Sequence, residues 1–230
     1  MVKRTISLIL ICGAGLVCMR AADQVSAPDR TVHGNVIISD HDPGVRIELP
    51  KSVQYVGADR WILYGNADCE LHAFVEGDQG RNVRRVYWVQ FEGYLASKPE
   101  LHHEYDSPRH AQIGGLDFYV DTYVRPKTAK VDSGSDREHI EAIIRGQGYK
   151  MPAGMMLVRF VHLPDKEKRK ELMIIYGEDL ASTGLSAEEL QDGGRAHERW
   201  PGIEADLVER AKGTIILQQT GKHGKEAETH

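Results

Sequence analysis

The sequence of 230 residues has little cysteine and no long apolar run. Its three cysteines, Cys12, Cys18 and Cys69, are too few for a disulfide framework and lack the paired spacing of a zinc site. The longest apolar run covers residues 6–19, which is shorter than the roughly 20 residues that a membrane-spanning helix needs. These absences exclude a small disulfide-stabilised protein and a protein with many membrane spans.

The chain also lacks a surplus of basic residues. It has 29 Lys and Arg against 34 Asp and Glu, a formal charge of −5, which predicts neither a nucleic-acid partner nor an anionic membrane surface. A G-x-S-x-G nucleophile, a glycine-rich dinucleotide loop after a strand and repeats of roughly 20–50 residues are missing as well. What is present, 41% hydrophobic and 27% charged residues, is typical of a globular protein.

The first 22 residues have the layout of a secretory signal peptide. Lys3 and Arg4 precede the apolar run, and Arg20 closes it. We therefore expect an exported protein, periplasmic or secreted, with no membrane span once residues 1–22 have been removed. An uncleaved anchor or a buried helix is the alternative. A lipid anchor at Cys18 is another, although the residues before Cys18 match a lipoprotein signal poorly.

The rest of the chain divides into three parts by composition. Residues 23–44 are polar and rich in turn residues, which predicts a linker with one edge strand in it. Residues 45–218 contain evenly spread apolar segments with no long polar interruption, so we expect a single domain there. Residues 219–230 hold almost no apolar side chain, which predicts a disordered tail.

Alternation of apolar and polar residues predicts half-buried strands in the first half of that domain. The strands are expected at 45–49, 60–64, 69–76, 83–94 and 116–125. The glycine-containing turn at 77–82 joins two of them in an antiparallel hairpin. Two apolar runs, 155–163 and 172–176, flank a charged turn and predict a second hairpin at the centre of the sheet.

Helix signals appear only in the second half of the chain. Ser133 or Ser135 can cap a helix that carries isoleucines on one face. Ser186 begins a capping box, and Pro201 fits the first turn of a last helix. Strands first and helices later predict an α+β fold, with a mainly antiparallel sheet built from hairpins and two or three helices in the C-terminal half.

A histidine-rich irregular segment is the first candidate for function. His102, His103, Asp106 and His110 offer imidazole and carboxylate donors to a metal such as zinc. The spacing is not that of a metalloprotease helix, and Pro108 interrupts any regular helix. The pattern predicts either a metal-dependent hydrolase site or ordinary surface histidines in a polar loop.

The strand at 116–125 is the second candidate, because it has a polar face of aromatic and charged residues. The strand at 83–94 can add side chains from one of its faces, namely Arg84, Trp88, Gln90 and Glu92. Flat aromatic rings beside carboxylates suit sugars, peptides or cations. The predicted ligand-binding residues are Trp88, Asp117, Tyr119, Asp121 and Tyr123. Cross-strand stabilisation of a half-solvated sheet explains the same pattern without a ligand.

Two further residues carry expectations of their own. Arg159 lies in an apolar strand and needs a counter-charge, for which the nearby acids are candidates. These acids are Glu171, Glu178 and Asp179. Cys69 alternates with apolar residues, which predicts a buried and unreactive thiol.

The sequence therefore predicts an exported, non-catalytic α+β protein that binds a small molecule, a peptide or a protein partner through a sheet face. The alternative is a metal-dependent hydrolase that uses the histidine-rich segment, with zinc as its cofactor. A purely structural envelope protein is the third interpretation. The sequence leaves open whether the protein is an enzyme.

Overall fold

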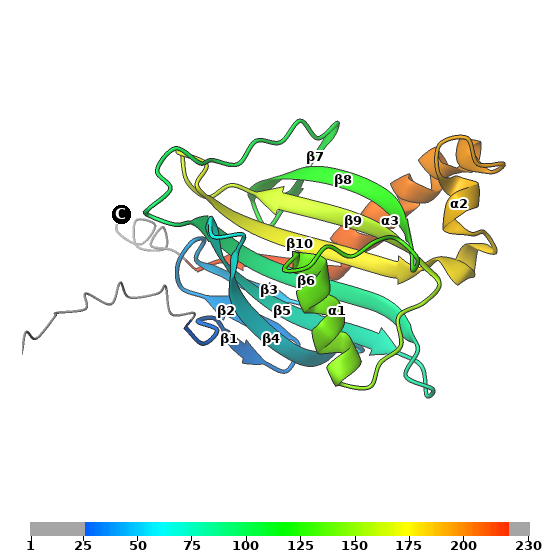
Figure 1. The fold of residues 1–230 in the computed structure, drawn as a ribbon, viewed down its shortest axis with the longest axis horizontal. Helices are drawn as coiled ribbons and strands as arrows, with labels where there is room; N and C mark the ends of the chain where they lie inside the picture. Colours follow the sequence, from blue (N-terminus) through cyan, green and yellow to red (C-terminus); the bar gives the residue numbers. More distant parts are fainter. Residues whose placement is uncertain (1–25, 221–230) are drawn as a thin grey trace, which may run out of the picture.

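The computed structural model describes residues 26–220, and its main element is a strongly curved sheet of seven antiparallel strands (Figure 1). In spatial order the strands are β4 (Gln54–Leu63), β5 (Ala67–Gly77), β6 (Val83–Tyr94), β10 (Lys170–Asp179), β9 (Gly154–His162), β8 (Leu116–Pro126) and β7 (Arg109–Ile113). The hairpin of β9 and β10 lies in the middle of this order, as its continuous apolar sequence predicts.

A second, smaller sheet has four antiparallel strands. They are β1 (Thr31–His33), β2 (Val36–Ser39), β3 (Val45–Glu48) and β11 (Ile216–Gln219), in that spatial order. The segment 23–44, expected to be a polar linker with one edge strand, thus contributes two paired strands. Its buried residue Ile37 explains this, because it faces the core between the two sheets.

Three α-helices lie in the second half of the chain: α1 (Asp136–Gly146), α2 (Ala187–Leu190) and α3 (Trp200–Thr214). Two 3-10 turns, Leu180–Thr183 and His197–Arg199, flank α2. Ser135 caps α1 by accepting a hydrogen bond from the backbone of Glu138. Ser186 forms the predicted capping box of α2, and Pro201 lies in the first turn of α3.

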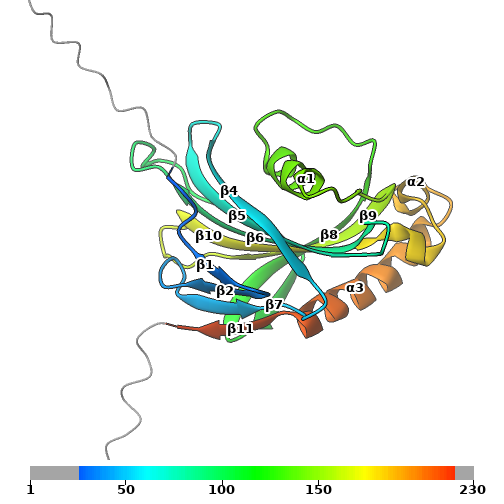
Figure 2. The same cartoon turned by 90° about the horizontal axis from the view of Figure 1, so that it is seen from below.

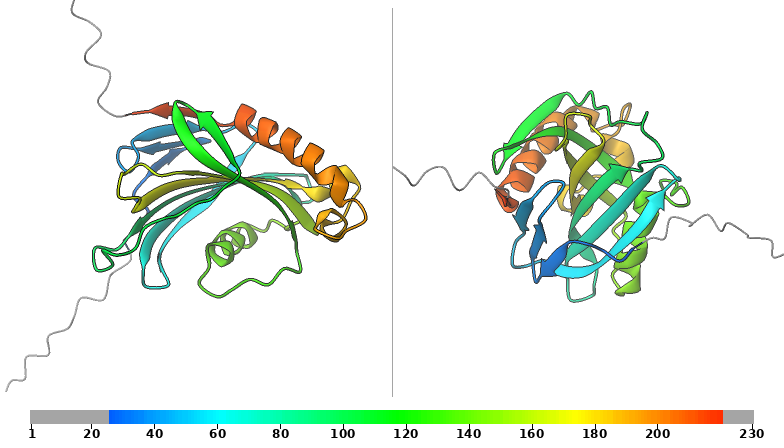
Figure 3. Two further views of the ribbon diagram at one scale, coloured as in Figure 1. Left: turned by 90° about the horizontal axis from the view of Figure 1, so that it is seen from above. Right: turned by 90° about the vertical axis from the view of Figure 1, so that its left-hand side faces the viewer.

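The large sheet has a separate apolar core on each of its faces. The four-stranded sheet and α3 cover one face, and α1 lies alone on the other (Figures 2 and 3). Ile140 and Ile144 of α1 are buried against this second face. Each such side chain contributes about 1.5–3 kcal/mol when it is fully buried. We call this second face the α1 face.

The α+β architecture predicted from the sequence is confirmed: both sheets are antiparallel and the helices follow in the C-terminal half. The irregular segment before residue 116 differs from its prediction, because it contains the edge strand β7. No helix within residues 26–220 has both the length and the hydropathy to cross a membrane. The predicted signal peptide and most of the predicted tail lie outside the described residues.

Candidate functional site

The polar residues of the strands at 83–94 (β6) and 116–125 (β8) point to the same face of the large sheet, as expected. β10 and β9 lie between these two strands. Tyr119 of β8 lies opposite Val161, which lies opposite Met173, which in turn lies opposite Gln90 of β6. Residues directly opposite each other on antiparallel strands point to the same side of a sheet. The same reasoning aligns Asp121 with Trp88 in the neighbouring row. All of these residues therefore lie on the α1 face.

The five predicted ligand-binding residues differ in exposure. Trp88 is buried in the core beneath α1 and donates its indole hydrogen to Gln90. Tyr119 and Tyr123 are half-buried at the border of the same core. Asp117 is exposed and accepts a hydrogen bond from Gln112 of β7. Trp88 is thus a core residue, and Asp117 lies at the margin of this face.

Arg159 pairs with Asp121, and not with the three acids that its position in the sequence suggested. The guanidinium Nη2 lies 2.6 Å from Asp121 Oδ2, directly across the β8–β9 pair. Arg159 Nε donates to the same carboxylate oxygen at 3.2 Å, and Ser107 donates a third hydrogen bond to it at 2.9 Å. The sequence could not give this partner, because it depends on how β8 and β9 are registered. The charge of Arg159 is compensated within the sheet.

Two other acids of the α1 face, Glu92 on β6 and Glu171 on β10, are directly opposite each other in the sheet. No lysine or arginine in the described part of the chain lies within 4.0 Å of either carboxylate. Two carboxyl groups placed side by side in a partly buried position cannot both ionise easily. This acid pair is the main electrostatic feature of the α1 face.

The loop before β7 covers Glu171, which is only 3% exposed. Tyr105 donates its hydroxyl hydrogen to Glu171 Oε2, and His103 Nδ1 lies 3.3 Å from the same oxygen. Burial raises the pKa of Glu171 to about 7, although the Tyr105 hydrogen bond opposes the shift. Burial also lowers the pKa of His103 to about 4, so this imidazole is neutral at neutral pH and does not offset the acid.

Glu92 has hydrogen-bond donors that are weak or uncharged. Its Oε2 accepts from the thiol of Cys69 and from the amide of Gln90, each at 3.3 Å. Burial, followed by repulsion from Glu171, raises the pKa of Glu92 to about 8. Burial also raises the pKa of the Cys69 thiol, so the predicted buried cysteine is confirmed. At neutral pH the acid pair therefore retains a proton.

A third carboxyl group adds to this cluster from α1. Burial raises the pKa of Asp136, the first residue of the helix. Its Oδ1 is one of three buried side-chain atoms in the described residues with no hydrogen-bond partner; the others are His103 Nε2 and Trp61 Nε1. Trp61 is opposite Cys69 in the sheet and stacks on His139 of α1. All three atoms thus belong to residues of the α1 face or its covering loop.

We call Cys69, Gln90, Glu92, Tyr105, Asp136 and Glu171 the acid cluster. Most buried polar atoms in native proteins find a partner, so a group of unsatisfied atoms around one cluster needs an explanation. Its oxygens can accept hydrogen bonds, and the guanidinium of Arg159, which lies over the ring of Tyr105 at 5.3 Å from the ring centre, is already paired with Asp121. The cluster is chemically suited to a group that brings hydrogen-bond donors and positive charge.

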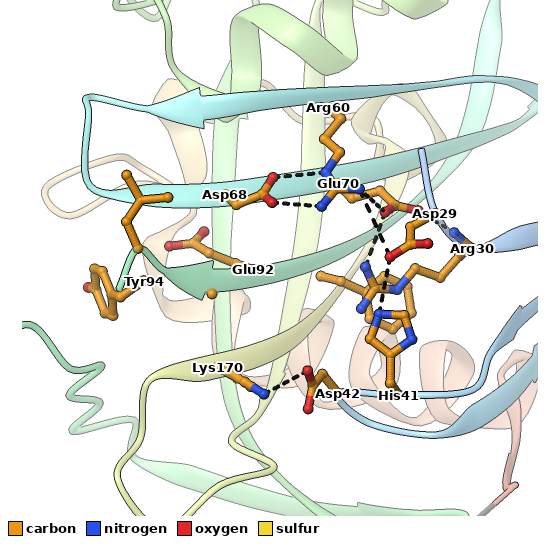
Figure 4. A pocket seen from close by; sticks show the side chains of 13 residues that line it. Asp29, Arg30, His41, Asp42, Arg60, Asp68, Glu70, Glu92, Tyr94 and Lys170 are labelled. Atoms are coloured by element: carbon orange, nitrogen blue, oxygen red, sulfur yellow. Dashed lines mark hydrogen bonds and ion pairs between the residues drawn. The ribbon is translucent and has the colours of Figure 1, made fainter. Parts of the chain in front are cut away.

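A polar pocket of ≈ 270 Å³ with a different character lies on the opposite side of the same strands, and Glu92 also belongs to its lining (Figure 4). Arg30 pairs with Glu70 at 3.1 Å, Arg60 with Asp68 at 2.7 Å, and Lys170 with Asp42 at 2.6 Å. His72, also buried, lies 2.9 Å from Glu70. The Arg30–Glu70 and Lys170–Asp42 pairs tie the N-terminal segment to the large sheet, and the other two pairs lie within that sheet. We call this the paired-charge pocket.

The histidine-rich segment is not assembled into a metal site. His102 is exposed and pairs with Glu104, His103 turns inward to Glu171, and His110 packs against Tyr119. Asp106 is exposed in the loop between them. No three His, Cys, Asp or Glu side chains of residues 26–220 are placed to hold one metal ion. The hydrolase alternative therefore finds no ligand set in this loop.

From the sequence, Glu171 is a candidate only for pairing with Arg159, and Tyr105 and Asp136 have no expected functional role. Glu171 was detectable as an acid within a central apolar hairpin. Tyr105 reaches it from 66 residues away, a contact that no local pattern reveals. No family model matches this chain, and no curated protein or solved structure resembles it significantly.

Proposed function

We propose that this protein is an exported binding protein that holds a small organic cation, an amine or a guanidine, at the acid cluster on the α1 face. The observation that carries the proposal is the direct opposition of Glu92 and Glu171 on adjacent strands without a basic partner. His103, only 6% exposed and with an unpaired ring nitrogen, supports a ligand at the same place.

The chemistry of binding follows from the state of the free site. The acid pair holds a proton at neutral pH because two adjacent carboxylates repel each other. An ammonium or guanidinium group would replace that proton and donate hydrogen bonds to both carboxylates, which are stronger when one partner is charged. The carboxylate of Asp136 offers a further acceptor from the helix. Binding should therefore release protons and become tighter as the pH rises through 7 to 8.

Calorimetry with a panel of butylamine, benzylamine and agmatine tests this proposal, with benzyl alcohol as the uncharged counterpart of benzylamine. We expect at least one cation to bind and benzyl alcohol not to bind. The variants Glu92→Gln and Glu171→Gln should each weaken the affinity roughly tenfold or more, since each removes a charge-assisted hydrogen bond. Repeating the titration in buffers of different ionisation enthalpy measures the released protons.

Glu104→Gln is the matched control, because Glu104 is exposed on the covering loop and forms its ion pair with His102 outside the acid cluster. It should bind as the unmodified protein does. Failure of every cation to bind, equal binding of benzyl alcohol, or full affinity in both glutamine variants would contradict the proposal. Export is tested separately by mass spectrometry of the protein from its native host. A mature N-terminus near residue 23 is expected, and an intact Met1 would contradict export.

A further inference from the structure

A second pocket, of ≈ 230 Å³, lies between α1 and the adjoining ends of β8 and β9. Its lining is basic: five residues carry positive charge and one carries negative charge. The charged residues are Arg125, Lys127, Arg137, Arg145, Lys150 and Glu141. This sign is opposite to that of the whole chain, which has a formal charge of −5. The pocket is therefore a local concentration of positive charge on an acidic protein.

Glu141 cannot neutralise this pocket. Its two oxygens are already occupied by Arg137, at 2.7 Å, and by Arg145, at 3.1 Å. Within the described residues, Arg125, Lys127 and Lys150 have no carboxylate within 4.0 Å. The result is three basic side chains around one space without a counter-charge.

Arg125 is the most informative of the three, because it is half-buried on β8 and the lysines are exposed. Burial lowers the pKa of its guanidinium group, and repulsion from Arg137 adds to this effect. A guanidinium group in such a position costs free energy unless an anion or a hydrogen-bond acceptor is near. Its five donors are arranged in a fixed plane that matches a carboxylate or a phosphate.

The remaining lining is apolar and would exclude a small, fully hydrated anion. It consists of Pro126, Tyr149, Met151, Pro152 and Met155. Methionine and aromatic side chains form adaptable contacts with an apolar ligand body. A pocket with a basic side and an apolar side fits an amphipathic ligand better than inorganic phosphate alone.

We infer that this pocket binds an organic anion, a carboxylate or a phosphate monoester that carries an aromatic or short aliphatic group. The anionic group would lie against Arg125 and the two lysines, and the apolar group against the methionines and Tyr149. The inference concerns a ligand of opposite charge at a different site, so it stands whether or not the acid cluster binds a cation.

Calorimetry with phenyl phosphate and benzoate tests the inference at low salt and at moderate salt. Inorganic phosphate lacks the apolar group and benzyl alcohol lacks the charge, so both should bind much more weakly. Arg125→Gln should weaken phenyl phosphate binding roughly tenfold or more, because a charged hydrogen-bonding partner is lost. The double variant Lys127→Gln/Lys150→Gln should weaken it less and reduce its salt dependence, because both lysines are exposed.

Arg84→Gln is the control, since Arg84 is an exposed arginine outside the pocket, and it should bind normally. Thermal unfolding of each variant shows whether it is folded. Vesicles of phosphatidylglycerol, compared with phosphatidylcholine, show whether the anion comes from a lipid. If the protein binds phosphatidylglycerol vesicles but not phosphatidylcholine vesicles, and Arg125→Gln abolishes this binding, the inference is supported and the anion is a lipid headgroup. Full affinity in folded Arg125→Gln, or no binding of any anionic probe, overturns the inference.

Discussion

The paired-charge pocket and the acid cluster are built on the two faces of the same strands, yet their carboxyl groups behave in opposite ways. Glu70 of β5 is buried and surrounded by Arg30, Arg60 and His72. Its hydrogen bonds and ion pairs outweigh the effect of burial and lower its pKa to about 2. Glu171 is buried and Glu92 is half-buried directly beside it, and the pKa values of both are raised. The surroundings decide the behaviour of each carboxyl group.

This difference separates a structural role from a functional one. A buried acid that is fully paired stabilises one conformation and leaves nothing for a ligand to satisfy. Buried acids without a basic partner are costly in the free protein, and such groups concentrate at functional sites. The paired-charge pocket, drawn in Figure 4, is therefore best explained as a structural feature that fixes the N-terminal segment to the large sheet. The acid cluster is the better candidate for binding.

The largest expected effect is on the free energy of unfolding, and it comes from the paired-charge pocket. Glu70→Gln removes the negative charge from a position that is 1% exposed and leaves Arg30 without its buried partner. We expect a loss of about 3–5 kcal/mol in the free energy of unfolding, the usual cost of breaking a buried ion pair from one side. Urea denaturation measures it. A loss below about 1 kcal/mol would show that the ion pairs of the paired-charge pocket contribute little to the stability of the fold.

Glu48→Gln provides the matched comparison, because Glu48 forms an ion pair with Arg46 at the surface of the small sheet. Exposed pairs contribute only about 0–1 kcal/mol. The two variants remove the same charge, from a buried acid with three basic or imidazole partners and from a partly exposed acid with one, so the difference between them measures what burial and the additional partners contribute together.

The next largest effect is the dependence of stability on pH, which should have opposite signs for the two regions. Glu70 has its pKa lowered from the usual 4.5, so its contribution is present above pH 4.5 and is lost as the pH falls towards 2. Glu92 and Glu171 have raised pKa values, so their contribution is present below pH 4.5 and is lost as the pH rises through 7 to 8. Each proton changes the free energy of unfolding by up to about 1.4 kcal/mol per pH unit.

Urea denaturation at intervals between pH 5 and pH 8.5 measures the loss of stability that is due to Glu92 and Glu171. The unmodified protein should become less stable over that range, and the double variant Glu92→Gln/Glu171→Gln should lose most of the slope. If the slope persists in the folded double variant, the acid pair is not its source. The single variant Glu104→Gln should leave the slope unchanged, because its side chain is exposed.

Much of the fold was predictable because it follows from local patterns. The alternation in β5, β6 and β8 marks their two faces, and Ser135 and Ser186 mark the starts of α1 and α2. Two features escaped prediction, each for a reason of its own. Only one strand was expected in residues 23–44: the apolar residues of β2 mark a strand, whereas β1 is short and mostly polar, and its pairing with β2 is set only in the folded sheet. A strand within the histidine-rich segment was hidden by its charged and turn-forming residues.

The candidate site was predictable only in part. Alternation identified Tyr119 and Asp121, and it placed Trp88, Gln90 and Glu92 on one face of their strand. It could not show that β9 and β10 lie between the two strands, so Glu171 was missing from the centre of the site. Contacts such as that of Tyr105 with Glu171 join residues distant in sequence, and only the folded chain determines them.

The smallest expected effect distinguishes the loop that covers the acid cluster from the sheet beneath it. Tyr105→Phe removes the hydroxyl that donates to Glu171 and leaves the ring in place. Because this hydrogen bond opposes the rise in the pKa of Glu171, its loss should raise that pKa further, by up to about one unit. Carboxyl carbon chemical shifts followed through a pH titration measure the change. Tyr64→Phe, on an exposed tyrosine, should leave the titration unchanged. A lower pKa in Tyr105→Phe would mean that the loop matters mainly by excluding water, because opening it would hydrate the carboxylate and favour its ionised form.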